Sequence, residues 1–149
     1  MNIKLHDKEN MKSVILESFK TDQELIDTYH VVSGSGLDNC VNKTFNDLNK
    51  ADPSFKFYLL EDNNKQLGFF GKEYSNYLTT IFIHPDYRNK QSVSKIWNLI
   101  KNEFTTPFYT AIYKKNTRAL NFYLKNNGRI IREDVYENNP FVLIEFKEV

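Results

Sequence analysis

Apolar side chains recur along this chain with two spacings, one typical of helices and one typical of strands. Short apolar runs bounded by turn-forming residues indicate strands. The predicted strands cover residues 2–5, 55–60, 66–74, 77–83, 107–113, 130–135 and 141–146. Apolar positions three and four residues apart indicate helices. The predicted helices cover residues 9–19, 37–49, 93–104 and 117–126, and residues 22–29 form either a helix or an irregular turn.

Turn-forming residues mark the ends of several elements. Residues 61–64 (EDNN) predict a hairpin turn between two strands. Pro85 ends the strand before it, because proline has no N–H to donate to a ladder, and residues 127–128 (NG) predict a left-handed helix stop. The element order β-α-α-β-β-β-α-β-α-β-β predicts an α/β or α+β chain, with helices packed over a mixed sheet. A chain of 149 residues, 40% of them hydrophobic, fits one domain over residues 1–149.

Composition excludes several classes of protein. The chain has 20 basic and 19 acidic residues, a balance that fits neither a disordered polyelectrolyte nor a uniformly basic nucleic-acid binder. No apolar run approaches the roughly 20 residues of a membrane helix, and residues 1–16 lack the apolar centre of a signal peptide, so we expect a cytoplasmic protein. The single cysteine, Cys40, is expected to be a packing residue rather than a nucleophile. No Cys or His spacing resembles a metal site, so no metal is expected.

Positive charge is concentrated in the second half of the chain. Residues 1–75 hold 9 lysines, no arginine and 12 acidic residues, whereas residues 76–149 hold 11 basic and 7 acidic residues. The segment 88–132 contains ten basic residues and one acidic residue, Glu103. These charges form either a solvated face balanced by the acidic half or a surface for an anionic ligand or partner, phosphorylated or polymeric.

A loop between a buried strand and a helix is the first candidate binding site. Residues 81–94 (IFIHPDYRNKQSVS) connect the two elements through a basic stretch. A helix start presents unpaired backbone N–H groups and the positive end of the helix dipole, which suits a phosphate or pyrophosphate. The loop contains no glycine, so by itself it is a weak indication of phosphate binding.

Two motifs in this half of the chain resemble those of a known family. Residues 83–90 (IHPDYRNK) resemble the acetyl-coenzyme A loop of the GNAT superfamily of N-acetyltransferases, whose pattern is apolar, x, Pro, x, aromatic, Arg, x, x, Gly, x, Gly or Ala. Residues 116–128 (NTRALNFYLKNNG) resemble the family motif Asn-x-x-Ala-x-x-aromatic-Tyr-x-x-x-Gly. The resemblance covers residues 55–128 in detail. It implies the GNAT fold, with a mixed, mostly antiparallel central sheet of about seven strands flanked by about four helices.

The resemblance also implies a cosubstrate and a reaction. Acetyl-coenzyme A would give its acetyl group to a primary amine, of a small molecule or a protein, by direct attack. The strands 77–83 and 107–113 would separate and leave backbone groups near Ile81 and Ile83 free to bond the pantetheine arm as an added strand. The N–H groups of residues 89–94 would hold the pyrophosphate. Cations of segment 88–132 would suit the 3′-phosphate and adenine. The residues expected to bind the coenzyme are Ile81, Phe82, Ile83, Arg88, Asn89, Lys90, Gln91, Ser92, Val93, Ser94, Asn116 and Tyr123.

Tyr123 is the expected catalytic residue. Many family members place at this motif position the tyrosine that protonates the leaving thiolate. The alternative is an aromatic side chain of the helix, packed beside Phe122 with its hydroxyl satisfied. Asn116 either bonds the coenzyme or caps the helix, a position that favours asparagine.

Other residues have weaker assignments. His84 is either an edge residue just past its strand or a general base. Glu73 and Tyr74, at a strand end, are candidates for the wall of the acceptor cleft. Residues 33–36 (SGSG) form either a lid over the acceptor or an ordinary linker. The shape of the acceptor site is expected to depend on loops near residues 21–42 and 137–140, and a homodimer is compatible with the family.

The chain departs from the family pattern at positions that bear on activity. Gln91 and Val93 replace the glycine and the glycine or alanine that let the backbone approach the pyrophosphate closely. Thr79 stands where many members have an acidic residue, which leaves no evident carboxylate base, and Arg129 replaces the usual phenylalanine.

These departures keep other functions open. One alternative is a GNAT-fold module that has lost catalysis and acts as a binding or structural protein, for example within a phage or mobile-element assembly. A nucleic-acid or acidic-protein binder that uses the cations of segment 88–132 is a third, less favoured reading.

Overall fold

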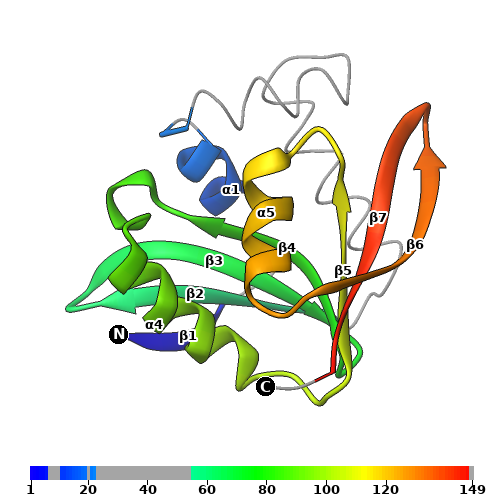
Figure 1. Ribbon diagram of the computed structural model, residues 1–149. Coiled ribbons are helices and arrows are strands. Elements are labelled where there is room, and N and C mark those ends of the chain that lie inside the picture. Colours follow the sequence, from blue (N-terminus) through cyan, green and yellow to red (C-terminus); the bar gives the residue numbers. More distant parts are fainter. Residues whose placement is uncertain (7–10, 20, 23–54, 148–149) are drawn as a thin grey trace.

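The computed structural model describes residues 1–6, 11–19, 21–22 and 55–147 (Figure 1). Seven strands of these residues form one sheet in the order β1-β2-β3-β4-β5-β7-β6. Neighbouring strands are antiparallel except β4 and β5, which are parallel. The strands are β1 (Asn2–His6), β2 (Lys56–Asp62), β3 (Lys65–Glu73), β4 (Tyr77–Ile83), β5 (Phe108–Tyr113), β6 (Arg129–Tyr136) and β7 (Asn139–Phe146). The mixed, mostly antiparallel sheet of about seven strands is therefore confirmed.

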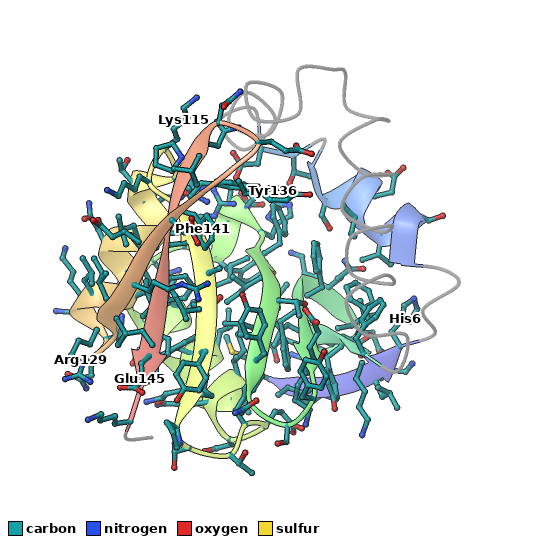
Figure 2. All side chains as sticks on the ribbon, turned by 90° about the vertical axis from the view of Figure 1, so that its right-hand side faces the viewer. His6, Lys115, Arg129, Tyr136, Phe141 and Glu145 are labelled. Atoms are coloured by element: carbon teal, nitrogen blue, oxygen red, sulfur yellow. The ribbon has the colours of Figure 1, made fainter. Side chains whose placement is uncertain are left out.

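Helices lie on both faces of this sheet. The described α-helices are α1 (Met11–Phe19), α4 (Lys90–Lys101) and α5 (Thr117–Lys125), with a short 3-10 helix, η2 (Pro85–Tyr87). Figures 1 and 2 show α4 and α5 on one face and α1 on the other. The predicted helix 37–49 lies outside the described residues, as do most of the segment 22–29, the glycine-containing segment 33–36 and Cys40.

The predicted strand bounds differ from the observed ones by no more than two residues, but one helix differs more. The prediction placed it at residues 93–104, whereas α4 begins at Lys90 and ends at Lys101. Its first residues are polar, so a pattern of apolar positions does not detect them. The helix start is fixed by the side chain of Asn89, which accepts the N–H of Ser92 at 2.9 Å. Phe104 follows the helix yet is 6% exposed, because the turn after α4 returns it to the core.

The predicted turns form for the expected reasons. Asn63 and Asn64 have φ angles of 51° and 67°, the left-handed backbone that a two-residue hairpin requires. Asn127 has φ of 71° after α5, and the N–H of Gly128 donates to the carbonyl of Tyr123 at 2.9 Å. This is the hydrogen bond of a Schellman helix stop. A side chain at Gly128 would meet that carbonyl at 2.6 Å, so glycine is needed there.

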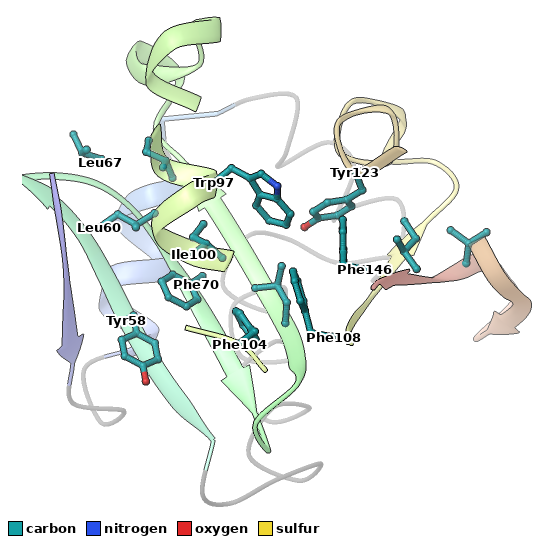
Figure 3. Close-up of a cluster of buried hydrophobic side chains, with 14 residues drawn as sticks. Tyr58, Leu60, Leu67, Phe70, Trp97, Ile100, Phe104, Phe108, Tyr123 and Phe146 are labelled. Carbon is teal, nitrogen blue, oxygen red and sulfur yellow. The ribbon is translucent and has the colours of Figure 1, made fainter. Parts of the chain in front are cut away.

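An aromatic cluster fills the space between the sheet and the helices α4 and α5 (Figure 3). Trp97 of α4 lies 5.3 Å from the Phe146 ring of β7 and 5.9 Å from the Tyr123 ring of α5. Phe108 of β5 stacks on Phe146 at 4.7 Å and on Phe104 at 5.0 Å. Phe104 in turn lies 6.2 Å from the Phe70 ring of β3, so the cluster joins the β1–β4 part of the sheet to the β5–β7 part.

Candidate functional site

The strands β4 and β5 separate soon after they meet. Their parallel pairing consists of Tyr77 with Tyr109 and Leu78 with Thr110. The Thr110 hydroxyl donates to the carbonyl of Leu78 at 2.8 Å, so a side chain completes the last contact before the strands part. Beyond this point β4 continues to Ile83 with no partner in β5. The predicted opening between these two strands is thus present.

A β-bulge marks the place where the strands part. In the β3/β4 register Lys72 pairs with Leu78 and Gly71 with Thr80, which leaves Thr79 as an extra residue. A bulge bends the strand that carries it, and this bend accounts for the divergence of β4 from β5. The Thr79 hydroxyl oxygen is buried and has no hydrogen-bond partner among the described residues. Sequence analysis missed the bulge, because one inserted residue leaves an apolar run unchanged.

Beyond the bulge, alternate residues of β4 face the opening. The N–H of His84 donates to the carbonyl of Leu67 at 2.7 Å, so the backbone groups of Phe82 and His84 point toward β3. Those of Ile81 and Ile83 then point toward β5. The carbonyl of Ile83 is engaged, because it accepts the Nε–H of Arg88 at 2.8 Å. Ile81 therefore directs both its N–H and its carbonyl toward the opening, whereas Ile83 has only its N–H available there. Their contact with the coenzyme stays a prediction.

Arg88 takes part in an ion cluster that sequence analysis did not foresee. The Asp22 side chain is 4% exposed and pairs with both Arg88 and Arg118. The Arg88 guanidinium also lies over the Phe82 ring, 5.5 Å from its centre. The buried carboxylate pairs with one half-buried and one exposed arginine, and it thereby ties the loop before α4 to the start of α5. Arg88 therefore has a structural role, whether or not it also contacts a ligand.

The start of α4 offers some of the expected N–H donors. The N–H of Ser92 is bound to the Asn89 side chain, and the N–H of Val93 donates to the carbonyl of Asn89 at 3.0 Å. Ser94, one residue further on, belongs to the regular helix. Lys90 and Gln91 are the first two residues of the helix, whose N–H groups have no acceptor within it. Of the N–H groups of residues 89–94, those in the first turn of α4 are therefore the candidates for binding pyrophosphate. The N–H of Ser92 becomes available only when its hydrogen bond to the Asn89 side chain breaks.

The residues of the second motif lie on α5. Asn116 caps this helix, because its side chain accepts the N–H of Ala119 at 3.3 Å. Tyr123 is 1% exposed and packs against Trp97 and Phe146 (Figure 3). This position agrees with the packing alternative, and proton donation by Tyr123 stays a prediction. A contact between Asn116 and the coenzyme is likewise untested.

The residues with weaker assignments occupy separate places. His84 caps η2 with its side chain, whose Nδ1 accepts the N–H of Asp86 at 3.1 Å. Glu73 is buried beside Tyr77, its partner in the β3/β4 register. Tyr74 is 69% exposed in the turn between these strands, with φ of 56°. Glu73 therefore lies nearest to the closed end of the β4/β5 opening.

The cations of segment 88–132 are partly neutralised by acidic residues from outside it. Arg129 pairs with Glu145 at 2.9 Å, and Lys114 pairs with Glu133 at 2.8 Å. With Arg88 and Arg118 held by Asp22, four of the ten cations have acidic partners among the residues that the structure describes. The excess positive charge read from the sequence is therefore smaller in the folded protein.

The described part of the chain contains no helix long and apolar enough to cross a membrane. Nor do its His, Cys, Asp and Glu residues include a group of three or more that is placed to hold a metal ion.

The chain matches the family model for the Acetyltransferase (GNAT) family over residues 16–128. No curated protein matches it. Its fold is similar to that of a GNAT-family acetyltransferase from Bacillus cereus (15% identity, TM-score 0.59, 99% of this chain and 97% of that chain covered). It is similar to apo YjaB from Escherichia coli (16% identity, TM-score 0.63, 97% and 95% covered). It is also similar to the Campylobacter jejuni N-acetyltransferase PseH, whose structure contains acetyl coenzyme A (19% identity, TM-score 0.56, 99% of each chain covered).

At these identities the solved structures show the fold, and the family model shows the family. The match to the family model spans residues 16–128, well over half of the chain, and includes both motifs and the β4/β5 opening. This protein therefore belongs to the GNAT acetyltransferase family.

Proposed function

We propose that this protein transfers the acetyl group of acetyl-coenzyme A to a primary amine. The observation that carries the proposal is the opening between β4 and β5, which leads from the bulge at Thr79 to the start of α4. Unpaired backbone groups of a strand edge suit an extended amide chain, and a helix start suits phosphates. We further propose that residues 1–149 act as one domain and that the protein is cytoplasmic.

The residues at the opening fit the pantetheine arm and pyrophosphate of the coenzyme. Ile81 presents an N–H and a carbonyl toward β5, where an amide of the arm would pair with them. The N–H groups of Lys90 and Gln91 would donate to the pyrophosphate. The side chain of Gln91 is exposed, so the absence of a glycine need not block this approach.

The proposed reaction is direct attack of the neutral amine nitrogen on the thioester carbonyl, which forms an amide and releases a thiolate. The proposed role of Tyr123 is to donate its hydroxyl proton to that thiolate sulfur. Tyr123 lies on α5, which packs against β5, the strand that borders the opening. With threonine at position 79 on β4, the amine proton would leave through water rather than through a carboxylate at that position.

A titration of purified protein with acetyl-coenzyme A tests the proposal. Calorimetry should show saturable binding, and a ligand concentration of about 100 times Kd should raise the melting temperature by roughly 5 to 10 °C. Gln91→Gly should tighten binding, because glycine lets a phosphate approach the helix start more closely. Acetyl phosphate serves as the control ligand, since it cannot fill the opening.

A second candidate function has one observation in its favour. The N–H of Ser92, expected to bind pyrophosphate, is already held by Asn89, and Gln91 and Val93 replace small residues. These features are compatible with a GNAT-fold module that binds a protein partner without catalysis. Failure to bind acetyl-coenzyme A at millimolar concentration, by both the protein and Gln91→Gly, would favour this alternative.

A further inference from the structure

A pocket lies on the sheet face opposite α4 and α5. Its volume is about 420 Å³, and its walls come from β4, β5, β6 and β7. Tyr113 and Phe141 are cross-strand partners in β5 and β7, and both line it. Tyr77 and Tyr136 add two further aromatic rings. Figure 2 shows Tyr136 and Phe141 near the same end of the β6/β7 pair. This wall favours a ligand with a flat apolar group.

The pocket has one charged residue among its described lining residues, Arg132. Arg132 pairs in register with Leu143, another lining residue, so both lie on the pocket face of the sheet. Its guanidinium has no ion-pair partner in the described part of the chain, unlike those of the other three arginines. The carboxylate of Asp134, two residues along β6, accepts the N–H of Val135 at 2.8 Å and does not line the pocket.

The hydroxyl of Tyr77 adds a polar group to the pocket. Burial raises the pKa of Tyr77 above its ordinary value, and the charge of Glu73 raises it further. A backbone hydrogen bond from Ala111 and the charge of Arg132 lower the pKa by a smaller amount. The hydroxyl therefore stays protonated at neutral pH and is able to donate a hydrogen bond.

The pocket borders the β4/β5 opening. Ala111 and Tyr113 line it, and both follow Thr110, the last residue of β5 that pairs with β4. A ligand held against this stretch of β5 therefore has one end close to the place where the strands separate. This is the side from which an amine would reach a thioester lying in the opening.

We propose that this pocket binds the acceptor and that the acceptor is an aliphatic primary amine that carries one aromatic ring and one carboxylate. The proposal rests on the proposed acetyl transfer. The aromatic rings would pack on the flat group, and the Arg132 guanidinium would hold the carboxylate through charge-assisted hydrogen bonds. A single lining cation matches a monoanion better than a phosphate dianion, which needs more donors.

Two pairs of probes test this assignment, each pair differing only by a carboxylate. They are L-phenylalanine with 2-phenylethylamine, and L-tyrosine with tyramine. Binding is measured by calorimetry without acetyl-coenzyme A, and acetyl transfer is measured separately with it. The protein should bind the carboxylate-bearing member of each pair about tenfold more tightly, and Arg132→Gln should abolish this preference. Arg132→Lys should retain part of it, since lysine keeps the charge but not the fork of donors.

Arg129→Gln is the matched control. It removes the same charge from the same strand, but Arg129 pairs with Glu145 and lies outside the pocket wall. It should keep the preference. Equal binding within each pair, loss of the preference in Arg129→Gln as well, or no binding of any probe at millimolar concentration would overturn the inference. Acetylation of both members of a pair at equal rates would overturn the acceptor assignment but leave the proposed acetyl transfer intact. Carboxylate-dependent binding by a protein that does not bind acetyl-coenzyme A would refute only the proposed reaction.

Discussion

The hydroxyl of Tyr123 is the single group on which the proposed proton transfer depends. Tyr123→Phe removes this hydroxyl and keeps the ring that packs on Trp97 and Phe146. We expect turnover to fall about a hundredfold, a typical contribution of a positioned acid, with little change in the Kd for acetyl-coenzyme A. Steady-state kinetics and calorimetry on the same preparation check the two parts.

Tyr109→Phe is a suitable control for that measurement. It removes a hydroxyl that donates to Glu145 at 3.2 Å, on a residue at the closed end of the opening and outside the pocket wall, so turnover should be unchanged. Full activity in Tyr123→Phe would exclude proton donation by this residue and leave the packing role alone.

Several residue roles follow from the sequence and others do not. The capping of α5 by Asn116 and the stop at Asn127 depend on neighbours in the chain, so local motifs predict them. Asp22, by contrast, meets Arg88 across 66 positions of sequence and Arg118 across 96. Such pairing depends on how the elements pack, and no local pattern encodes it.

The junction of β4 with β5 contains two threonines whose hydroxyls are in opposite states: Thr110 is buried, and Thr79 is half-buried with a buried hydroxyl oxygen. The Thr110 hydroxyl donates to the carbonyl of Leu78, whereas the Thr79 hydroxyl has no partner in the described structure. A buried polar group without a hydrogen bond lowers stability, and a satisfied one raises it. Thr79→Val should therefore raise the free energy of unfolding by about 1 kcal/mol, and Thr110→Val should lower it by about 1 to 2 kcal/mol.

Urea denaturation of the two variants measures both changes. A loss of stability in Thr79→Val as large as that in Thr110→Val would mean that the Thr79 hydroxyl is bonded in solution. Weaker binding of acetyl-coenzyme A by a stabilised Thr79→Val would indicate that this hydroxyl meets the ligand.

At the level of elements, the spacing of apolar residues and the turn-forming residues were sufficient to predict every described strand. An alternating or apolar run still indicates a strand when the strand ends are displaced by one or two residues. The existence of each strand was therefore easier to predict than its exact bounds. The bulge at Thr79 was not predicted, because the run 77–83 (YLTTIFI) reads the same with or without an inserted residue. The pattern predicts only a strand at Gly68, yet a Cβ there would lie 2.0 Å from the carbonyl oxygen of Phe82. These features arise from strand pairing, which a single sequence does not reveal.

On the scale of the whole molecule, the two parts of the sheet share little backbone pairing. Two residue pairs connect β4 to β5, so side chains must carry most of the connection. Phe108 is 0% exposed and stacks between Phe104, which follows α4, and Phe146 of β7. Its ring also lies 6.2 Å from that of Trp97. Phe104 in turn lies 6.2 Å from the Phe70 ring of β3, so Phe108 is linked to the β1–β4 part through Phe104.

Phe108→Ala should destabilise the protein as one unit. Truncation of a buried phenylalanine leaves a cavity and costs about 3 to 5 kcal/mol. Phe108 is linked to β3 through Phe104 and to β7 through Phe146, so the two parts should still unfold together. Far-ultraviolet circular dichroism and tryptophan fluorescence should both report one transition, at a lower denaturant concentration. Leu124→Ala is the control, since that side chain is 40% exposed on α5 and should change stability by less than about 1 kcal/mol. Two separate transitions in Phe108→Ala would mean that β1–β4 and β5–β7 hold their structure independently, and the opening between them would then be a hinge rather than a fixed site.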